Sequence, residues 1–325
     1  MNKLLVICGP TATGKTSLGF RIAKKYNGEI VSADSRQVYK HMDIGTGKEW
    51  DGEIKVWGYD LVDPSDNFSV SDYFSEIKPV IEDIWNRNKV PIIVGGTGLY
   101  IKSLIDGIPT IDIPQNPNLR SSLEKLDIKE LYDRLAMLDG TKAASLNFSD
   151  KNNPRRLIRA IEIAVWNVEN ETQKRIVQKR DNILDKNIDV LIIGLTSNNK
   201  RLLENIEKRV DKRMNEGFID EIEMLLKMGV SWKNQSMQSL GYKEAELFFK
   251  HGLSYEEFIT TWISNEMKYI KRQITWFKKE TYRDGNKRII WFDIDDPDFP
   301  NIVVNYVDKW YSTDREYMKN KLDKS

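Results

Sequence analysis

The N-terminal stretch "KLLVICGPTATGKTSL" constrains the fold more than any other part of the sequence. An apolar segment with strand character runs into a loop that fits the pattern G-x-x-x-x-G-K-[ST]. In this pattern the loop amides and the start of the next helix bind phosphate, the lysine adds a charge, and the hydroxyl can ligate Mg²⁺. The expected phosphate-binding residues are Gly9, Thr11, Ala12, Thr13, Gly14, Lys15 and Thr16. The cofactor is expected to be Mg²⁺, held by Thr16. The pattern does not distinguish ATP from another diphosphate.

Two later segments repeat the order of strand followed by polar or glycine residues. "EIVSAD" ends at Asp34, and "VPIIVGGTGLY" contains a glycine turn around Thr97. Strands that alternate with helices predict a parallel sheet, in which ligands bind at the carboxyl ends of the strands. Residues 9–16, 34–37 and 95–97 are therefore expected to converge on one site.

The middle of the chain predicts a separate helical region. Residues from about 119 to 186 show helical spacing alone, and "NNPRRLIRAIEI" has Asn153 as N-cap and Pro154 at the first helical position. The expected fold is α/β, with a P-loop NTPase-like parallel sheet core flanked by helices and an all-helical insertion domain. The core is assigned to residues 1–116 plus 187–325, and the insertion to residues 117–186.

Further elements are expected on both sides of this boundary. "DVLIIGL" predicts a strand that returns to the sheet, and "RIIWFDI" predicts a late strand. Helices are expected at about 199–228 and 254–280, and the charged tail beyond about Thr313 is expected to fray.

Composition excludes several classes of protein. The single cysteine, Cys8, rules out an internal disulfide framework and a cysteine-based zinc site. No apolar run approaches the roughly 18 residues of a membrane span, and no export signal is recognisable. A cytoplasmic monomer with no membrane association is the expectation.

The net charge of +1 conceals an uneven distribution. Residues 51–76 hold seven acidic residues and one basic residue, whereas residues 268–288 hold eight basic and two acidic residues. A local basic surface suits a polyanionic partner, although a solvated helix face gives the same pattern.

Asp34 has three possible roles at the end of its strand. It can hold Mg²⁺ through water, act as a general base, or cap the next helix. Gln37 is placed to hydrogen-bond an adenine edge. The usual Walker-B pattern is missing, which weakens the interpretation as an ordinary ATPase.

Seven motifs in order give the chain a specific resemblance. They are "GPTATGKTSL", "SADSRQVYKHMDIGTGK", "VGGTGLYIKSL", "NNPRRLIRAIEI", "RVDKRMNEGFIDEI", "QSLGYKE" and "KRQITWFKK". From about Leu4 to about Trp291 the sequence resembles the tRNA dimethylallyltransferases, also called tRNA isopentenyltransferases, in their bacterial form without a zinc finger.

The resemblance implies a reaction and roles for named residues. The dimethylallyl group of dimethylallyl diphosphate would move to N6 of the adenosine 3′-adjacent to the anticodon of a tRNA, and diphosphate would leave. Asp34 would be the general base, Thr97 would meet the target nucleotide, and Arg209 would neutralise charge on the diphosphate. The target base would flip out of the anticodon stack. The segments implied to contact the tRNA anticodon stem-loop are Asp34, Ser35, Arg36, Gln37, Thr97, Arg155, Arg156, Arg159, Gln238, Gly241, Tyr242, Lys243, Lys271, Arg272, Gln273 and Lys278.

The sequence departs from the family pattern in two places. "VWGYDLVDP" lacks the short histidine-containing stretch that usually precedes it. Arg213 stands where the family more often has an apolar residue, and it would add a contact either to the diphosphate or to RNA.

Three other functions compete with tRNA prenylation. An adenylate isopentenyltransferase would act on free AMP, ADP or ATP, but would not need the helical insertion or the basic C-terminal helix. A small-molecule P-loop kinase would need an arginine-rich lid, which is not evident. A non-catalytic RNA-binding protein would not need the intact Gly14-Lys15-Thr16 sequence together with Asp34.

Overall fold

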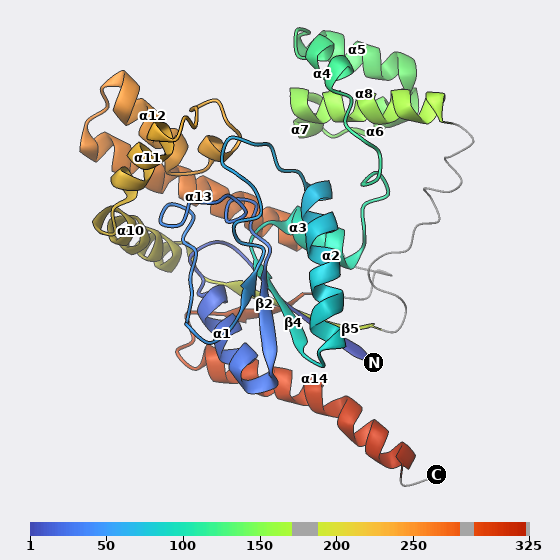
Figure 1. The fold of residues 1–325 in the computed structure, drawn as a ribbon, viewed down its shortest axis with the longest axis vertical. Helices are drawn as coiled ribbons and strands as arrows, with labels where there is room; N and C mark the ends of the chain where they lie inside the picture. Colours follow the sequence, from blue (N-terminus) through green and yellow to red (C-terminus); the bar gives the residue numbers. More distant parts are fainter. Residues whose placement is uncertain (171–187, 280–288, 323–325) are drawn as a thin grey trace. The chain divides into compact units, whose positions relative to one another are not determined.

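The computed structural model describes residues 1–170, 188–279 and 289–322. In these ranges six strands form one sheet in the order β3-β2-β4-β1-β5-β6, and every pairing is parallel (Figure 1). The strands are β1 (Asn2–Cys8), β2 (Gly28–Ser32), β3 (Val56–Trp57), β4 (Val90–Gly95), β5 (Ile188–Thr196) and β6 (Ile290–Asp293). The predicted α/β fold with a parallel sheet is confirmed. Because β1 lies between β4 and β5, the loop that follows it emerges at the centre of the sheet.

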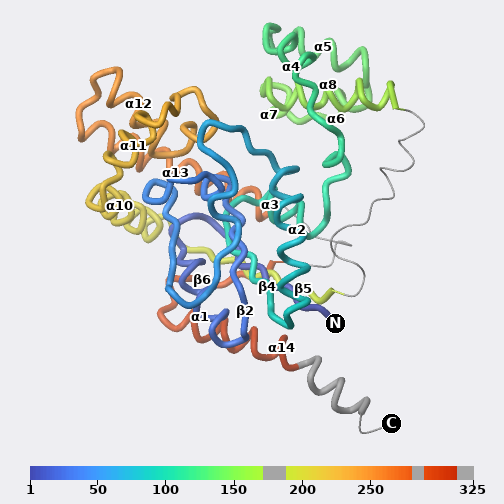
Figure 2. The backbone as a smooth tube through the Cα atoms, in the orientation of Figure 1, coloured from blue at the N-terminus to red at the C-terminus, as the bar shows by residue number. Residues whose placement is uncertain are grey.

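Helices cover both faces of this sheet (Figure 2). Leu5 and Ile7 of β1 share a core with α1 (Lys15–Tyr26) and α14 (Phe299–Leu322). Leu4 and Val6 point to the other face, because successive strand residues alternate. There they share a core with α2 (Val70–Asn86), α3 (Gly98–Ile105), α10 (Asn199–Asn215), α11 (Phe218–Lys227), α12 (Tyr242–His251) and α13 (Tyr255–Lys279).

Three details differ from the expectations or refine them. The helical segment expected at 199–228 is two helices, because Gly217 at φ 97° separates α10 from α11. Helix α14 continues to Leu322, past Thr313, where the sequence predicted fraying. Cys8 is buried in β1, and burial raises the pKa of its thiol to about 12, so it remains protonated at neutral pH.

The chain divides into two compact units, residues 1–106 with 183–325 and residues 107–182. The sequence placed these divisions at 116/117 and 186/187. The described part of the second unit is helical, and Leu131, Leu135, Leu157 and Ile161 belong to a core of its own. Its helices are α4 (Pro117–Leu123), α5 (Ile128–Leu138), α6 (Gly140–Ser145), α7 (Phe148–Lys151) and α8 (Pro154–Glu169). The predicted cap of α8 is confirmed, because the Asn153 side chain accepts a hydrogen bond from the Arg156 N–H.

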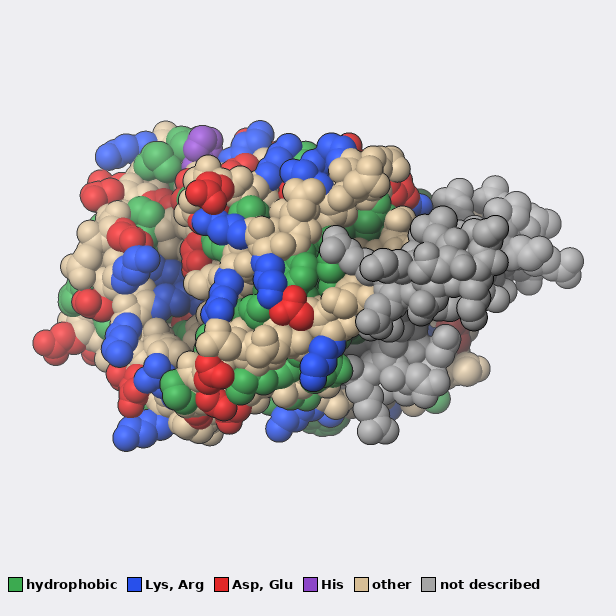
Figure 3. All heavy atoms as spheres, turned by 90° about the horizontal axis from the view of Figure 1, so that it is seen from below, with side chains coloured by type: hydrophobic (Ala, Val, Ile, Leu, Met, Phe, Trp, Pro, Cys, Tyr) green, Lys and Arg blue, Asp and Glu red, His purple; other side chains and the backbone are tan. Residues whose placement is uncertain are grey.

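The surface carries charges of both signs. On the face drawn in Figure 3, Lys and Arg side chains are interspersed with Asp and Glu. Within the described ranges, no helix is both long enough and apolar enough to cross a membrane.

Candidate active site

The glycine-rich loop that the motif predicts to bind phosphate, called the phosphate-binding loop below, joins β1 to α1. Gly9 has φ 135°, and a Cβ there would lie 2.4 Å from the carbonyl oxygen of Leu195. Gly14 has φ 76° and immediately precedes Lys15, the first residue of α1. Side-chain-bearing residues rarely adopt this backbone conformation, so both glycines are needed. The free N–H groups at the start of α1 and the loop backbone together favour a bound anion.

Lys15 lies half-buried against its own loop. Its Nζ donates a hydrogen bond to the Pro10 carbonyl at 2.6 Å, and the buried Thr13 hydroxyl donates to the same oxygen at 2.9 Å. Burial, and then the charge of Arg209, lower the pKa of Lys15 to about 8. The folded protein thus disfavours the charged form of Lys15, and a bound anion would stabilise that form.

Two cavities adjoin this loop and share part of their lining. The loop cavity has a volume of about 570 Å³ and includes Thr16, Gln37 and Glu49. The α13 cavity has a volume of about 330 Å³ and extends to Gln238 and Arg272. The residues that line both are Thr11, Lys15, Asp34, Gly96, Arg209 and Arg213. The predicted convergence of the three strand ends is therefore confirmed.

Asp34 lines both cavities and lies two residues after the end of β2. Its Oδ1 accepts a hydrogen bond from the Arg36 N–H at 2.9 Å. The following residues form a turn, so Asp34 does not cap a helix. Arg36 also lines the α13 cavity and donates to the Gln235 carbonyl at 3.4 Å. A local turn thus orients the carboxylate of a residue that lines both cavities.

Thr97 connects the β4 turn to the Asp34 segment. Its hydroxyl oxygen accepts a hydrogen bond from the Ser35 N–H at 3.0 Å. Tyr269 of α13 also hydrogen-bonds to Thr97, while burial raises the pKa of this tyrosine to about 12. Thr97 therefore holds together the two segments that the sequence assigned to the target nucleotide.

Helix α10 holds the phosphate-binding loop through two side chains one turn apart. Arg209 donates a hydrogen bond from Nη1 to the Thr11 hydroxyl. Asn205 donates to the Ala12 carbonyl at 2.9 Å. Arg209 thus faces the loop, as the resemblance implied, rather than pairing with residues of its own exposed helix face.

Gln273 bridges two parts of the site from α13. Its Oε1 accepts a hydrogen bond from the Thr11 N–H, and its Nε2 donates to the Gly96 carbonyl, both at 3.0 Å. The side chain is buried. The sequence placed Gln273 among the tRNA contacts, whereas the structure shows both ends of its amide bonded within the protein.

Gln37 is likewise engaged by the protein itself. Its Oε1 accepts from the Ser32 hydroxyl at 2.7 Å, and its Nε2 donates to the Gly47 carbonyl at 3.0 Å. These partners occupy the amide that the sequence offered to an adenine edge. Gln37 instead holds the loop that follows it, which lines the loop cavity.

Glu221 of α11 anchors the same loop, a role that the sequence did not reveal. Its carboxylate accepts hydrogen bonds from the Asp43, Ile44 and Gly45 N–H groups at 2.7, 2.7 and 3.0 Å. The Tyr242 hydroxyl donates to it at 2.6 Å. Because these partners are remote in sequence, no spacing could have indicated them.

The "QSLGYKE" segment divides into structural and accessible residues. Tyr242 is fully buried on Glu221, and a Cβ at Gly241 would lie 2.7 Å from the Trp262 ring. Gln238 donates to the Trp232 carbonyl at 2.8 Å. Lys243 is exposed and lines the α13 cavity, so among these residues it is the cation available to a ligand.

Helix α13 presents several exposed cations. Lys271, Arg272 and Lys278 are exposed, and the Arg272 guanidinium lies 5.6 Å from the Tyr269 ring centre. Trp276, on the same helix, is partly buried and packs against the main core. The part of the basic stretch beyond Lys279 lies outside the described residues.

In the second unit, the arginines of α8 have different environments. Arg155 and Arg156 are exposed, and Arg156 forms an ion pair with Asp150 at 2.5 Å. Arg159 donates to the Thr110 and Ile113 carbonyls at 3.0 and 2.8 Å. Arg159 thus stabilises the unit itself, which its position on a helix face did not reveal.

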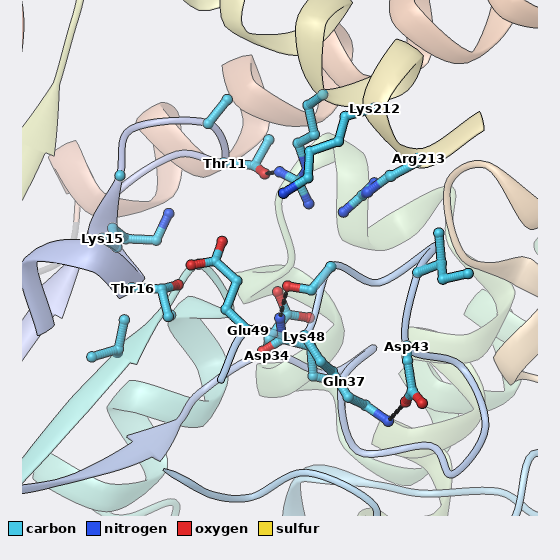
Figure 4. A pocket seen from close by; sticks show the side chains of 18 of the residues that line it. Thr11, Lys15, Thr16, Asp34, Gln37, Asp43, Lys48, Glu49, Lys212 and Arg213 are labelled. Atoms are coloured by element: carbon cyan, nitrogen blue, oxygen red, sulfur yellow. Dashed lines mark hydrogen bonds and ion pairs between the residues drawn. The ribbon is translucent and has the colours of Figure 1, made fainter. Parts of the chain in front are cut away.

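Three further charged residues line the loop cavity. Glu49 and Lys212 were not predicted as site residues, and the role of Arg213 was left open between two contacts. Figure 4 shows the Glu49 carboxylate pointing toward Lys15 and Thr16, and the ends of Lys212 and Arg213 directed into the pocket from α10. Helical spacing places residues 209, 212 and 213 on one side of α10. That spacing is the one signal by which Lys212 could have been found.

Comparisons with known proteins agree with this geometry. The family model described as IPP transferase matches residues 37–280, and one described as isopentenyl transferase matches residues 2–60. The tRNA dimethylallyltransferase of Anoxybacillus flavithermus is 38% identical over 94% of this chain and 96% of its own. The enzyme of the same name from Finegoldia magna is 37% identical over 95% of this chain and 98% of its own.

Solved structures give the same result. The tRNA isopentenylpyrophosphate transferase of Bacillus halodurans has a TM-score of 0.68 and 33% identity, with all of both chains covered. A eukaryotic dimethylallyltransferase, described as acting on tRNA, has a TM-score of 0.79 and 26% identity, and 98% of this chain covers 80% of that one. The chain therefore belongs to the IPP transferase family, whose curated relatives are the tRNA dimethylallyltransferases.

Proposed function

We propose that this protein transfers the dimethylallyl group of dimethylallyl diphosphate to N6 of the adenosine 3′-adjacent to the anticodon (position 37) in tRNAs, and releases diphosphate. One observation carries the proposal beyond family membership. Asp34 lines both the loop cavity, which contains Lys15 and Arg209, and the α13 cavity, which reaches the exposed Arg272 of α13. The first cavity suits the donor, and the second suits the acceptor base.

The loop cavity supplies the charge that a departing diphosphate requires. Lys15 and Arg209 contribute two cations, and the loop amides add oriented dipoles. As the bond between carbon and oxygen breaks, negative charge grows on the leaving oxygen. Cations already in place stabilise that charge more than they stabilise the bound substrate, which lowers the barrier.

The donor set of the loop cavity fits Mg²⁺. Thr16, Asp34 and Glu49 offer a hydroxyl and two carboxylates in the same cavity, and oxygen ligands are the ones this ion prefers. No group of three or more His, Cys, Asp or Glu side chains suited to a metal occurs among the described residues. Thr16 would thus hold the ion together with substrate phosphates and water, and the ion would add positive charge beside the diphosphate.

Asp34 is the proposed general base. The exocyclic amine of adenine is a poor nucleophile, because its lone pair is delocalised into the ring, so it needs alignment and a proton acceptor. The Arg36 N–H holds one carboxylate oxygen of Asp34 at 2.9 Å, which orients the group. Asp34 would accept the N6 proton as the new bond between carbon and nitrogen forms. A target base would reach this carboxylate by flipping out of the anticodon stack into the α13 cavity.

The exposed cations mark the proposed tRNA contacts. Lys243, Lys271, Arg272 and Lys278 in the first unit, and Arg155 and Arg156 in the second, are accessible to phosphates. A mononucleotide would use few of them. The number of these exposed cations therefore favours a tRNA over free AMP as the acceptor.

Prenyl transfer to two acceptors in parallel tests the proposal. Labelled dimethylallyl diphosphate and Mg²⁺ are incubated with unmodified tRNA and, separately, with AMP. Label is expected in tRNA alone, at the adenosine after the anticodon. Label in AMP alone would identify an adenylate isopentenyltransferase. Label in neither, together with ATP turnover, would identify a kinase. Lys15→Ala is the matched control, because it should raise the donor concentration required without changing the choice of acceptor.

A further inference from the structure

Arg213 is a buried cation whose side chain is incompletely paired. It is 3% exposed, and its Nη2 has no hydrogen-bond partner within the described part of the chain. Its ion pair with Glu266, from Nη1 to Oε1, measures 3.6 Å, which is too long for a strong hydrogen bond. A buried guanidinium normally has its donors satisfied, so this one calls for a ligand.

The unpaired nitrogen of Arg213 points toward the loop cavity, where the proposed function places dimethylallyl diphosphate. A Cβ placed on Gly47 would lie 2.6 Å from Arg213 Nη2 and 3.6 Å from the nearest nitrogen of Arg209. The two guanidinium groups thus reach the same point. Arg209 also donates to Thr11 of the phosphate-binding loop. In Figure 4 the guanidinium of Arg213 is directed into the loop cavity.

Like charges so close together need a compensating anion. Burial, and then Arg209, lower the pKa of Arg213. Glu266 offsets part of this charge from the other side, where it is 4% exposed and also accepts from Trp262 Nε1 at 3.4 Å. It does not reach Nη2. An oxyanion bound between Arg209 and Arg213 would supply the missing partner on the side of the cavity that faces the loop.

We propose that Arg213 is a second diphosphate-binding arginine, which donates from Nη2 to a phosphate oxygen that Arg209 also contacts, while Glu266 compensates its charge in the empty site. This inference rests on the proposed function, because it takes diphosphate as the anion. It decides between the two roles, diphosphate contact and RNA contact, that the sequence left open. An arginine at this place gives the chain an additional cation on the leaving group, at a position where the sequence departs from the family pattern described above.

Calorimetric titration with inorganic diphosphate and Mg²⁺ tests the proposal. Removing Arg213 alone would leave the buried Glu266 without its partner, so Glu266→Gln serves as the reference background. The double variant Arg213→Met/Glu266→Gln is expected to bind diphosphate about 10- to 100-fold more weakly than Glu266→Gln alone, as for the loss of one charge-assisted hydrogen bond. Arg201→Met, on the exposed part of the same helix, removes the same charge and should change the affinity by less than about twofold.

The outcomes separate this inference from the proposed function. The role of Arg213 would be refuted if the double variant and Glu266→Gln bound diphosphate with equal affinity. The proposed function would remain intact in that case, provided that wild-type protein binds diphosphate and Lys15→Ala does not. Unchanged diphosphate binding with weakened binding of an anticodon stem-loop RNA would also refute it, in favour of the RNA contact. Failure of wild-type protein to bind diphosphate would overturn the proposed function as well.

Discussion

The charge state of Lys15 should make diphosphate binding depend on pH in a calculable way. Without an anion, burial and then Arg209 lower the pKa of Lys15 to about 8. A bound diphosphate places negative charge beside the ammonium group and raises this pKa again. Binding therefore takes up a proton when the pH is above about 8, and takes up almost none well below it.

The size of the effect follows from this single group. At about pH 9 roughly nine-tenths of Lys15 is deprotonated in the empty site, so the Kd for diphosphate should be about tenfold higher than at pH 7. Above pH 8 the affinity should fall about tenfold per pH unit until the pH reaches the pKa of the bound state. Inorganic diphosphate loses a proton at alkaline pH, and burial and then Arg209 lower the pKa of Arg213 as well, so both proteins keep some pH dependence. Lys15→Arg should lack only the tenfold loss that belongs to Lys15, because a guanidinium keeps its proton to a higher pH than an ammonium group.

Calorimetry can follow both the affinity and the proton. Inorganic diphosphate is titrated into wild-type protein and Lys15→Arg between about pH 7 and about pH 9.5, in two buffers that differ in ionisation enthalpy. At the upper end wild-type protein should take up nearly one proton more than Lys15→Arg, because the protons of diphosphate and of Arg213 are common to both proteins. Parallel profiles in the two proteins would refute the reasoning, because they would assign the titration to another group.

Four further predictions concern stability, chemistry and RNA binding. Lys15→Met should raise the free energy of unfolding of the ligand-free protein at pH 7 by about 1–3 kcal/mol, as measured by urea denaturation. The reason is that folding lowers the pKa of Lys15, so the cost of keeping it charged is fully present below pH 8 and disappears toward about pH 10.5. A loss of stability in this variant would contradict the reasoning. Asp34→Asn should retain diphosphate and tRNA binding but lower single-turnover transfer by about 10²–10⁴-fold, and a variant as fast as wild type would exclude Asp34 as the base. Glu221→Gln should lower the free energy of unfolding by about 2–3 kcal/mol, because the carboxylate that accepts three backbone N–H groups is lost. The amides of residues 43–45 should also exchange hydrogen faster in this variant. Unchanged protection would mean that Glu221 does not anchor the loop. The exposed cations of α13 are Lys271, Arg272 and Lys278, and replacing all three should flatten the salt dependence of tRNA binding by roughly 0.7–0.9 log units per lost phosphate contact. An unaltered slope would mean that this face of the helix is solvated and does not contact the tRNA.

The sequence predicted the parts of the site that depend on local order. The phosphate-binding loop, Asp34 at its strand end and the glycine turn before Thr97 follow from short patterns and from the rule that parallel strands end at the same edge. The fold class follows from the alternation of strands and helices. Arg209 was identified through the resemblance alone, because one arginine on a charged helix carries no signal about what it faces.

The rest depends on contacts between segments that are remote in sequence. Gln37, Gln273, Tyr242 and Arg159 look like polar residues available to a ligand, yet each is bonded within the protein. A side-chain amide or hydroxyl that binds RNA and one that holds a loop have the same chemistry. Burial and partner geometry distinguish them, and neither has a periodicity that can be read along the chain. Glu221 was missed for the same reason.

The bridge made by Gln273 has a thermodynamic consequence. Its side-chain oxygen accepts the Thr11 N–H of the glycine-rich loop for which we propose diphosphate binding, while its helix carries exposed cations. An anion that requires this amide must displace Gln273, and an RNA that moves α13 alters the same hydrogen bond. The proposed binding of diphosphate and of RNA would thus be coupled through one donor. By linkage, whatever factor the RNA imposes on diphosphate affinity, diphosphate imposes on RNA affinity.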